Sequence, residues 1–241
     1  MNQTIETLLS HRSIRRFSAT PISAEMLSTI LDCGIAASSS SFIQCVSVIR
    51  VADTEKRAQL AHLAGDQPYV ASAAEFLVFC ADFHRHQQIH PEAQLGFTEQ
   101  TLIGAIDAAL MAQNCLTAAE SLGLGGVYIG GIRNQPADVS TVLALPNHVI
   151  PLFGLCLGYP DQNPEQKPRL PQSLIVHQDG YQHDLDRDTL QNYDEAVRHY
   201  YQTRTGGTKE MSWSEQISAT LSKEARPFMK EFLASKGFST K

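Results

Sequence analysis

The sequence predicts a fold in which a β-sheet is flanked by helices, and three observations support this prediction. Short runs rich in β-branched and aromatic residues recur along the chain, separated by stretches with the apolar spacing of helices. One helical stretch is long and mostly apolar. The 241 residues are 43% hydrophobic and 18% charged, which is typical of one sizeable globular domain. The expected strands span residues 46–51, 76–81, 126–129 and 152–157.

Helices are expected to account for much of the remaining chain. The first spans residues 4–9 and leads into a basic cluster, and the second begins after Ser23, a residue type that caps helix N-termini. Four serines at residues 38–41 then favour an irregular segment. Further helices are expected over residues 53–63, over residues 95–122, and in two stretches of the tail from residue 185 that a loop at residues 205–208 separates.

The long helix at residues 95–122 has small and large apolar side chains around much of its circumference. Gly104 and Ala108 are small, whereas Ile103 and Leu110 are large. A helix that is apolar on nearly all sides is normally buried. We therefore expect it to be covered, and another subunit is one surface that would do so.

Charge and hydropathy exclude several partners. Lys and Arg number 19 against 25 Asp and Glu, so the net charge is -6 and the basic surface of a nucleic-acid binder is not expected. No charged leader precedes a long apolar run, and no apolar run reaches the roughly 18 residues of a membrane span. We expect a soluble, unexported protein with no membrane partner.

The cysteines indicate a reducing compartment. They are five in number, scattered, and set among apolar or small residues, as buried free thiols usually are. We therefore expect a cytoplasmic protein. These residues are Cys33, Cys45, Cys80, Cys115 and Cys156.

Two groups of cations are candidates for binding an anion. Residues 11–16 read His-Arg-Ser-Ile-Arg-Arg, which combines positive charge with a hydroxyl donor in the way that phosphate sites do. A solvated helix end that complements the helix dipole would explain the same cluster equally well. The second group, Lys167 and Arg169, lies on a proline-rich loop at residues 161–171, whose stiffness limits the entropy lost when the cations hold an anion.

A glycine-rich stretch at residues 123–131 would allow backbone N–H groups to approach a flat ring closely. It is not a dinucleotide fingerprint, because Tyr128 stands where the third glycine is required and the glycines come before a strand rather than after one. Helix termination at Gly123 followed by tight strand packing is the structural alternative. Both interpretations can hold together.

Other chemistries have little support. Residues 80–90 contain Cys80, His84, His86 and His90, but their spacing matches no common zinc site, and a polar loop after a strand is the preferred interpretation, so no metal is expected. The motifs of serine hydrolases and of P-loop proteins are absent from the sequence.

Taken together, these motifs resemble the oxygen-insensitive NADPH nitroreductases and their flavin reductase relatives, which form the nitroreductase family. The resemblance covers nearly the whole chain and includes residues 65–67, 118–131 and 151–158. It implies an α+β fold, with a central mixed, mainly antiparallel sheet flanked by helices, in an intertwined homodimer that binds FMN at its interface. It also implies an FMN-binding core over residues 1–195 and a nucleotide-contacting extension over residues 196–241.

The resemblance assigns binding roles residue by residue. The first cluster and Arg169 would hold the FMN phosphate and ribityl chain, with Ser39 and Gln67 adding polar contacts. Residues 128–131 would lie along the isoalloxazine ring, and Lys167 would stand near N1 and O2, where a cation stabilises reduced flavin. The residues implied in FMN binding are His11, Arg12, Ser13, Ile14, Arg15, Ser39, Gln67, Tyr128, Ile129, Gly130, Gly131, Lys167, Pro168 and Arg169.

The resemblance also implies NADPH as the reductant. Arg204 would contact its 2'-phosphate, and Lys209 stands where the family has a second arginine, which keeps the charge but loses the planar fork. Ping-pong reduction of nitroaromatic compounds and quinones would follow, with no side chain needed as a catalytic base because hydride transfer belongs to the flavin. The alternatives are a flavin reductase that supplies free reduced FMN and a non-catalytic flavin-binding module.

Overall fold

The computed structural model describes residues 2–204 and 206–241, which form two compact units. The first unit runs to Asn163 and includes Arg226–Lys241, and the second spans Pro164–Ala225. Each has a buried apolar cluster of its own. The functional division predicted at residue 195 stays a prediction.

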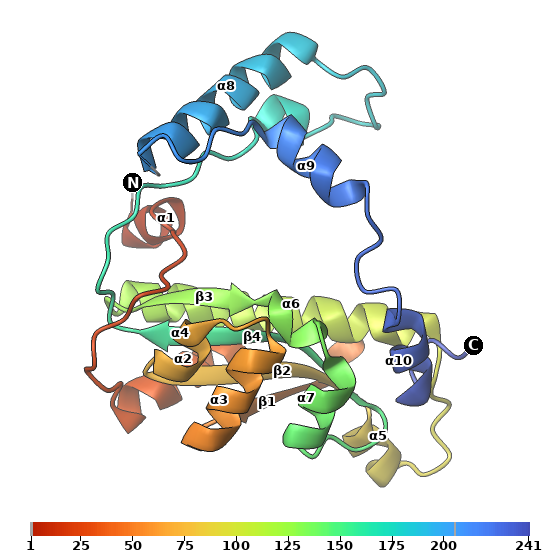
Figure 1. The fold of residues 1–241 in the computed structure, drawn as a ribbon. Helices are drawn as coiled ribbons and strands as arrows, with labels where there is room; N and C mark the ends of the chain where they lie inside the picture. The colour runs from red at the N-terminus through yellow and green to blue at the C-terminus, as the bar shows by residue number, and fades with distance from the viewer. Residues whose placement is uncertain (1, 205) are drawn as a thin grey trace. The chain divides into compact units, whose positions relative to one another are not determined.

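The first unit is built on one antiparallel sheet. Its strands are β1 (Val46–Arg50), β2 (Glu75–Asp82), β3 (Gly125–Ile129) and β4 (Val149–Gly158). They lie in the order β1-β2-β4-β3 (Figure 1), and every pair among them is antiparallel. All four overlap expected strands, and the predicted α+β class is confirmed. The pairing among these four strands is antiparallel throughout, with none of the parallel pairing that a mixed sheet would add.

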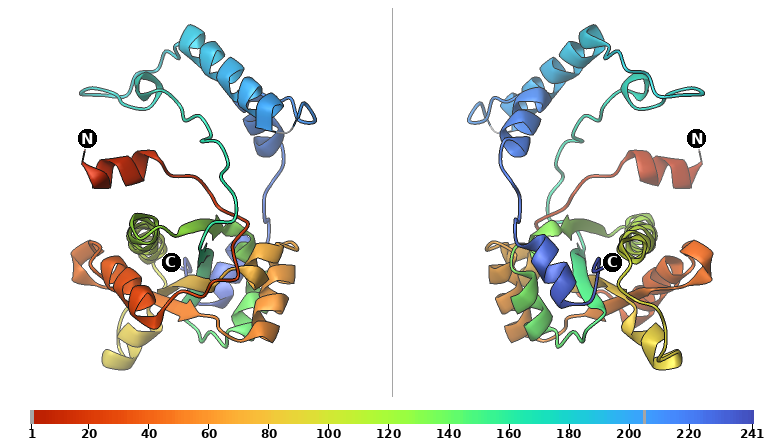
Figure 2. Two further views of the ribbon diagram at one scale, coloured as in Figure 1. Left: turned by 90° about the vertical axis from the view of Figure 1, so that its left-hand side faces the viewer. Right: turned by 90° about the vertical axis from the view of Figure 1, so that its right-hand side faces the viewer.

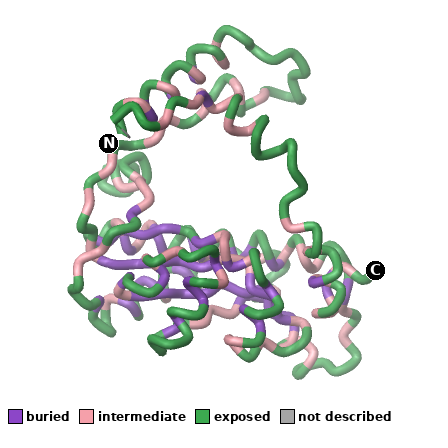
Figure 3. Tube along the Cα trace, in the orientation of Figure 1, coloured by how far each residue is buried: buried purple, intermediate pink, exposed green. Residues whose placement is uncertain are grey.

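Helices cover both faces of this sheet. Side chains alternate along a strand, so Phe76 and Val78 of β2 point to one face and Leu77 and Phe79 to the other. All four are fully buried, and Figure 3 shows buried residues concentrated in the strands. The first face packs against α3 (Thr54–Leu63), α4 (Pro68–Ser72) and α7 (Pro136–Val142), and the second against α2 (Ala24–Ile35) and α6 (Thr98–Ser121).

Local sequence explains where two of these helices begin. The Ser23 side chain accepts a hydrogen bond from the backbone N–H of Met26, and Asp53 does the same for Lys56. Each satisfies a donor that the first turn leaves without an intrahelical partner. The predictions of helices at these positions are confirmed.

The long helix α6 has an inner and an outer side. Gly104 lies so close to β2 that an added Cβ would stand 2.6 Å from the Cβ of Ala81. On the outer side, Leu102, Ile106 and Leu110 are exposed. By length and composition alone α6 could cross a membrane, but core helices pass the same test, and 39% of its most apolar window is buried in the structure.

Peripheral elements complete the first unit. They are α1 (Gln3–Leu9), which was expected, α5 (His84–Ile89) and α10 (Met229–Ser235). Phe232 of α10 and Phe83 pack together with Ile150 of β4 in a smaller apolar cluster. Figure 2 shows that α10, near the C-terminus, lies beside the sheet.

The second unit consists of α8 (Arg187–Arg204), α9 (Trp213–Leu221) and a preceding loop. Tyr193, Val197, Tyr200 and Tyr201 recur along one side of α8 and form a buried cluster, against which Trp213 packs. Residues 161–171 form no helix, and no strand runs through them, as their prolines predict.

Three expectations need correction. Residues 84–89 form α5, so the predicted polar loop is wrong. The helix has no apolar face, and it is stabilised instead by contacts with other segments, such as the hydrogen bonds of Arg85 to Ser47 and Asp82. Helices α4 and α7 were not expected, and the described part of the tail contains three α-helices rather than two. Of the loop predicted at residues 205–208, the part that follows Thr205 forms a turn, whereas Thr205 lies outside the described residues.

Candidate functional site

The basic cluster is held beside the glycine-rich strand by Ile14. The Ile14 backbone N–H donates to the carbonyl oxygen of Gly126 at 2.9 Å, and its side chain is 3% exposed. A Cβ on Gly125 would stand 2.5 Å from Ile14 Cγ1, so the glycine permits this close approach. The structure therefore brings the first cationic cluster, which was predicted to bind phosphate, next to the glycine-rich stretch.

His11 is oriented by an acid that the sequence prediction missed. Its Nδ1 lies 2.6 Å from Oε1 of Glu120 on α6, and both side chains are partly buried. A carboxylate can only accept, so Nδ1 carries the proton and Nε2 is left to face another group. Glu120 also lines a cavity of about 270 Å³, together with Arg12 and Gly125.

The arginines of the cluster differ in their partners. Arg16 binds Asp161, with Nε 2.7 Å from the backbone oxygen and 3.1 Å from Oδ2. Within the described chain, the side chains of Arg12, Ser13 and Arg15 make no hydrogen bond or ion pair with protein. Cations and a hydroxyl in this state are suited to a phosphate group, which supplies several strong acceptors.

The predicted ring-binding residues lie at the end of β3 and in the turn after it. The Ile129 side chain is fully buried in the core, so only its backbone can face a ligand. Tyr128 is 37% exposed, its ring stands edge-on to Phe153 with centroids 5.6 Å apart, and partial burial raises the pKa of its hydroxyl. Gly130 is open, with Arg133 Nη2 at 3.5 Å from a built Cβ.

Gly131 and Gln67 are brought together. A Cβ on Gly131 would overlap the carbonyl oxygen of Ala64 and stand 2.5 Å from Gln67 Nε2. The Gln67 amide donates to that carbonyl at 2.7 Å and accepts from the Tyr69 hydroxyl at 2.5 Å. Gln67 thus keeps one N–H for a ligand beside the predicted ring-binding backbone.

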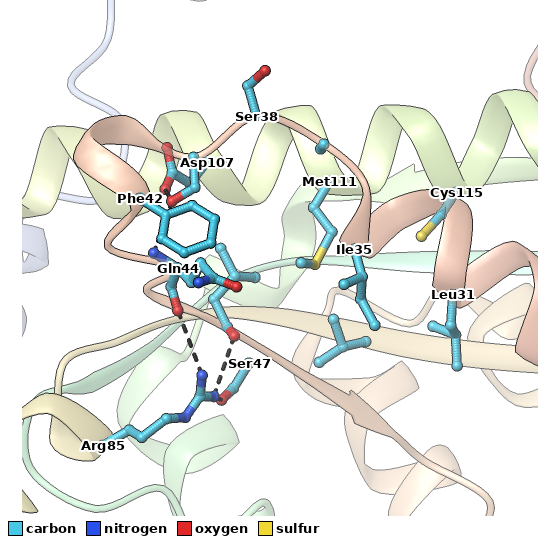
Figure 4. A pocket seen from close by; sticks show the side chains of 14 residues that line it. Leu31, Ile35, Ser38, Phe42, Gln44, Ser47, Arg85, Asp107, Met111 and Cys115 are labelled. Atoms are coloured by element: carbon cyan, nitrogen blue, oxygen red, sulfur yellow. Dashed lines mark hydrogen bonds between the residues drawn. The ribbon is translucent and has the colours of Figure 1, made fainter. Parts of the chain in front are cut away.

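Ser39 lies at a second place in the first unit, where it lines a cavity of about 790 Å³. Figure 4 shows this cavity from close by. The Ser39 hydroxyl donates to Asp107 Oδ2 at 2.6 Å and accepts from the Gln44 N–H at 2.7 Å, so a single acceptor lone pair remains for any ligand. Phe42, which lines the same cavity, is 80% exposed. Arg85 lines the cavity near Gln44 and donates to Ser47 at 2.7 Å and to the Gln44 carbonyl at 3.4 Å.

The second unit carries the remaining predicted residues. Lys167 Nζ donates to the Tyr201 hydroxyl at 2.8 Å, and the Pro168 carbonyl accepts from Tyr193 at 3.2 Å. Arg169 donates to the backbone oxygen of Lys167 at 2.8 Å and remains exposed. These contacts hold an irregular loop against α8.

The two predicted nucleotide-binding cations each contact one of two consecutive tyrosines. Arg204 Nη1 donates to the Tyr200 hydroxyl at 2.6 Å, and Lys209 Nζ lies 4.0 Å from the centre of the Tyr201 ring. A positive charge over an aromatic face is attracted by the ring quadrupole. Tyr201 therefore contacts Lys167 of the predicted FMN set and Lys209 of the predicted NADPH set.

The acids Asp107 and Glu120 are functional candidates that sequence reasoning missed. Asp107 is 3% exposed, and a lone acid between Ile106 and Ala108 in an apolar helix was a usable signal of a buried partner. No group of three or more His, Cys, Asp or Glu side chains in residues 2–204 and 206–241 is placed to hold a metal ion.

Comparison with known families identifies the chain. The profile described as "Nitroreductase family" matches residues 8–159, and "Nitroreductase family, C-terminal domain" matches residues 167–241. The chain belongs to the nitroreductase family. The predicted family membership is confirmed.

Whole-length relatives support the same conclusion. The chain is 56% identical over 239 residues to "NADPH-flavin oxidoreductase" of Vibrio harveyi, covering 99% of each chain. It is 54% identical over 241 residues to "Oxygen-insensitive NADPH nitroreductase" of Salmonella typhimurium, covering 100% of each. The crystal structure of nitroreductase A from Vibrio parahaemolyticus superposes with a TM-score of 0.96 at 54% identity, covering all of both chains. The nitroreductase-like fold is confirmed.

Proposed function

We propose that this chain catalyses the two-electron, ping-pong reduction of nitroaromatic compounds and quinones by NADPH, with FMN as its bound cofactor. The observation that carries the proposal is the placement of residues 11–15 against the glycine-rich start of β3, where Arg12 and Arg15 make no side-chain hydrogen bond or ion pair with the described residues. Relatives named for NADPH-dependent reduction of flavin and of nitro compounds match the whole chain. The chain is accordingly an NADPH-driven, flavin-dependent oxidoreductase.

The residues of this chain bind and orient the cofactor. Arg12, Ser13 and Arg15 hold the phosphate, and Glu120 fixes the ring of the neighbouring His11. The backbone of residues 129–131 and the free N–H of Gln67 hold the carbonyl edge of a flat ring. When bound, FMN supplies hydride acceptance and donation, so no side chain is assigned as a base.

Binding of the reductant is assigned to the second unit. Arg204 and Lys209 supply positive charge for the 2'-phosphate of NADPH, which NADH lacks. A relative has been solved as a complex with NAD+, the Vibrio harveyi oxidoreductase, at a TM-score of 0.94 and 54% identity. We therefore assign selectivity for NADPH over NADH to these two cations.

The functional form is proposed to be a homodimer in the cytoplasm. The outer side of α6 exposes Leu102, Ile106 and Leu110, which is the kind of apolar surface that subunit interfaces cover. All five cysteines are free, in keeping with a reducing compartment. Sedimentation equilibrium would test the assembly, and a mass of one 26.5 kDa chain across the concentrations tested would reject the dimer.

The decisive experiment is an anaerobic absorbance spectrum of the purified protein before and after one equivalent of NADPH, followed by nitrofurazone. We expect a flavin band that bleaches with NADPH and returns with the nitro compound. Protein that lacks flavin and does not take up added FMN would reject the proposal. Flavin that does not respond to NADPH would indicate a non-catalytic flavin-binding module instead.

A flavin reductase is the second candidate, favoured by relatives named "NADPH-flavin oxidoreductase" and "FMN reductase (NADPH)", the latter 45% identical over 247 residues. It differs in the acceptor that takes the electrons. Turnover with nitrofurazone, with a quinone and with added free FMN, measured on one preparation, separates the two. A much higher kcat/KM with free FMN would favour the flavin reductase.

A further inference from the structure

Arg226 binds the turn that follows β3. It is the first residue of the C-terminal segment that belongs to the first unit. Its Nη2 donates to the carbonyl oxygen of Gly130 at 3.3 Å and to Asn134 Oδ1 at 2.8 Å, and its Nε donates to the same Asn134 oxygen at 3.2 Å. One guanidinium group thus holds the turn at two places, and all of these atoms lie within one unit.

Arg226 occupies this position at a cost. Its φ is 58°, in the left-handed region that favours glycine. A second cation is close by, because Arg133 Nη2 lies 3.5 Å from the Cβ that Gly130 would carry. Burial, and then the charge of Arg226, lower the pKa of Arg133. Glycine would relieve the backbone and a neutral side chain would relieve the repulsion, so the hydrogen bonds of the guanidinium group are what this arginine provides.

Neither backbone conformation nor packing explains the glycine at position 130. Its φ lies outside the left-handed region, and the nearest atom to an added Cβ is at an ordinary 3.5 Å. Gly131 differs, because Ala64 and Gln67 leave no room for a Cβ there. The missing side chain of Gly130 therefore serves to leave the backbone open, which favours a ligand at this turn.

The contact with the Gly130 carbonyl also sets the direction of the next N–H. The peptide bond between Gly130 and Gly131 is trans, so the carbonyl of the first and the N–H of the second point in opposite directions. Two consecutive glycines leave this peptide unusually free to rotate. Arg226 removes that freedom, and it turns the Gly131 N–H away from its own guanidinium group.

The contact with Asn134 extends the same restraint. The Asn134 backbone N–H donates to the Gly131 carbonyl at 2.8 Å, which closes the turn. Its side-chain amide donates to the Ala64 carbonyl at 3.3 Å, and the Gln67 amide donates to the same carbonyl at 2.7 Å. Arg226 thus belongs to a hydrogen-bond network that holds the turn and its neighbour Gln67 together.

We propose that Arg226 is a positioning residue that fixes the Gly130–Gly131 peptide so that the Gly131 N–H faces the bound cofactor. The inference rests on the proposed function, because it takes the ligand at this turn to be FMN. Arg226 acts through the backbone, and the geometry of its planar fork matters more than its charge. Its loss should change both the affinity for FMN and the environment of the bound ring.

The first test is titration of the apoprotein with FMN, followed by quenching of flavin fluorescence. Arg226→Gly removes the guanidinium group while accepting the positive φ, and we expect it to raise the FMN dissociation constant about ten-fold. Lys230→Gln is the control, since it removes a positive charge from an exposed position of the nearby α10 and should leave the constant unchanged. Equal FMN binding by Arg226→Gly and wild type would overturn the inference.

A second readout separates positioning from a purely structural role. At saturating FMN, the visible absorption maximum of bound flavin should differ between Arg226→Gly and wild type, because the hydrogen bond from Gly131 to the ring is altered. An unchanged spectrum together with a weaker affinity would overturn the inference. If Arg226→Gly folds poorly, Asn134→Ala, which removes the second acceptor of Arg226, should shift the spectrum in the same direction.

Arg226→Lys separates positioning from charge. Lysine keeps the positive charge but cannot bind two acceptors through a planar fork, so we expect FMN affinity between those of wild type and Arg226→Gly. Full wild-type affinity in Arg226→Lys would overturn the inference, because it would show that charge alone is needed.

The same titration distinguishes failure of the proposed function from failure of this inference. Wild-type protein that does not bind FMN would reject the proposed function. Wild-type protein that binds FMN, with an Arg226→Gly variant of unchanged affinity and spectrum, would reject only the role of Arg226.

Discussion

The hydroxyl of Ser39 donates to the carboxylate of Asp107 at 2.6 Å, which joins the serine-rich turn to the middle of α6 across 68 positions of sequence. The second oxygen of Asp107 accepts from the Ser40 N–H at 3.1 Å. The turn needs this anchor because Ser41, Phe42 and Gln44 all have positive φ, a conformation that costs free energy in residues other than glycine.

We expect Asp107→Ala to destabilise the protein. It would leave the Ser40 N–H and the Ser39 hydroxyl without their acceptor at a partly buried position, which costs about 2–3 kcal/mol of unfolding free energy. Asp107→Asn keeps one acceptor oxygen and should cost less. Urea denaturation of the three proteins measures this, and equal stability of Asp107→Ala and wild type would show that the turn needs no anchor.

Glu120 is expected to act on the cofactor through His11. Glu120→Ala frees the imidazole ring, and the loss of about one hydrogen bond to a charged group should weaken FMN binding about ten-fold. Glu99→Ala, which removes the same charge from an exposed position near the start of α6, is the control. If both variants bind FMN as the wild type does in fluorescence titration, His11 is not part of the phosphate site.

Gly130 and Gly131 form a matched pair in the proposed ring-binding turn. Gly131→Ala would force its Cβ onto the Ala64 carbonyl and the Gln67 amide, and such overpacking costs about 1–3 kcal/mol of stability. At Gly130 the nearest atom stands at an ordinary 3.5 Å, so Gly130→Ala should fold normally. Thermal unfolding distinguishes them, and similar melting temperatures would contradict the packing argument.

Much of the fold could be predicted because it follows from local patterns. The strands and α2 have clear periodicity, α6 is apolar around much of its circumference, and Ser23 and Asp53 mark where α2 and α3 begin. Helix α5 could not be predicted in this way, because its polar residues are held by contacts with other segments, such as His86 Nε2 to the Ile43 carbonyl at 2.7 Å.

The candidate site could likewise be predicted only where its residues are contiguous in the sequence. The contiguous motifs at residues 11–15 and 128–131 were visible in the sequence, and they stay predictions of FMN contacts. The partners of these motifs were not visible, because Glu120 meets His11 across 109 positions. Likewise, the contact of Lys167 with Tyr201 requires a loop and a helix to pack together, which residue spacing alone does not specify.

The buried thiols predict how the stability of the protein changes with pH. Burial raises the pKa of Cys80 and Cys156 to about 12 and that of Cys115 to about 11, so these thiols stay protonated in the folded state. The unfolded chain ionises nearer the ordinary value, so stability is fully present below that value and falls as pH rises toward 11–12. At pH 8 a thiol reagent should modify exposed Cys33 in the native protein and all five cysteines in urea. Rapid native modification of more than one thiol would contradict this.

Arg204 is expected to distinguish the two reduced nucleotides. Loss of a charge-assisted contact to the 2'-phosphate should raise the KM for NADPH about ten-fold or more in Arg204→Ala, whereas NADH has no such phosphate and its KM should hardly change. Arg198→Ala is the control, since that arginine of the same helix pairs with Glu215 at 3.1 Å. Lys209→Arg tests the second cation, because a planar guanidinium can bind phosphate through two N–H groups and should lower the KM for NADPH. Steady-state kinetics with both nucleotides decides: equal effects of Arg204→Ala on NADPH and NADH would place Arg204 outside the phosphate contact and leave Lys209 as the cation to pursue.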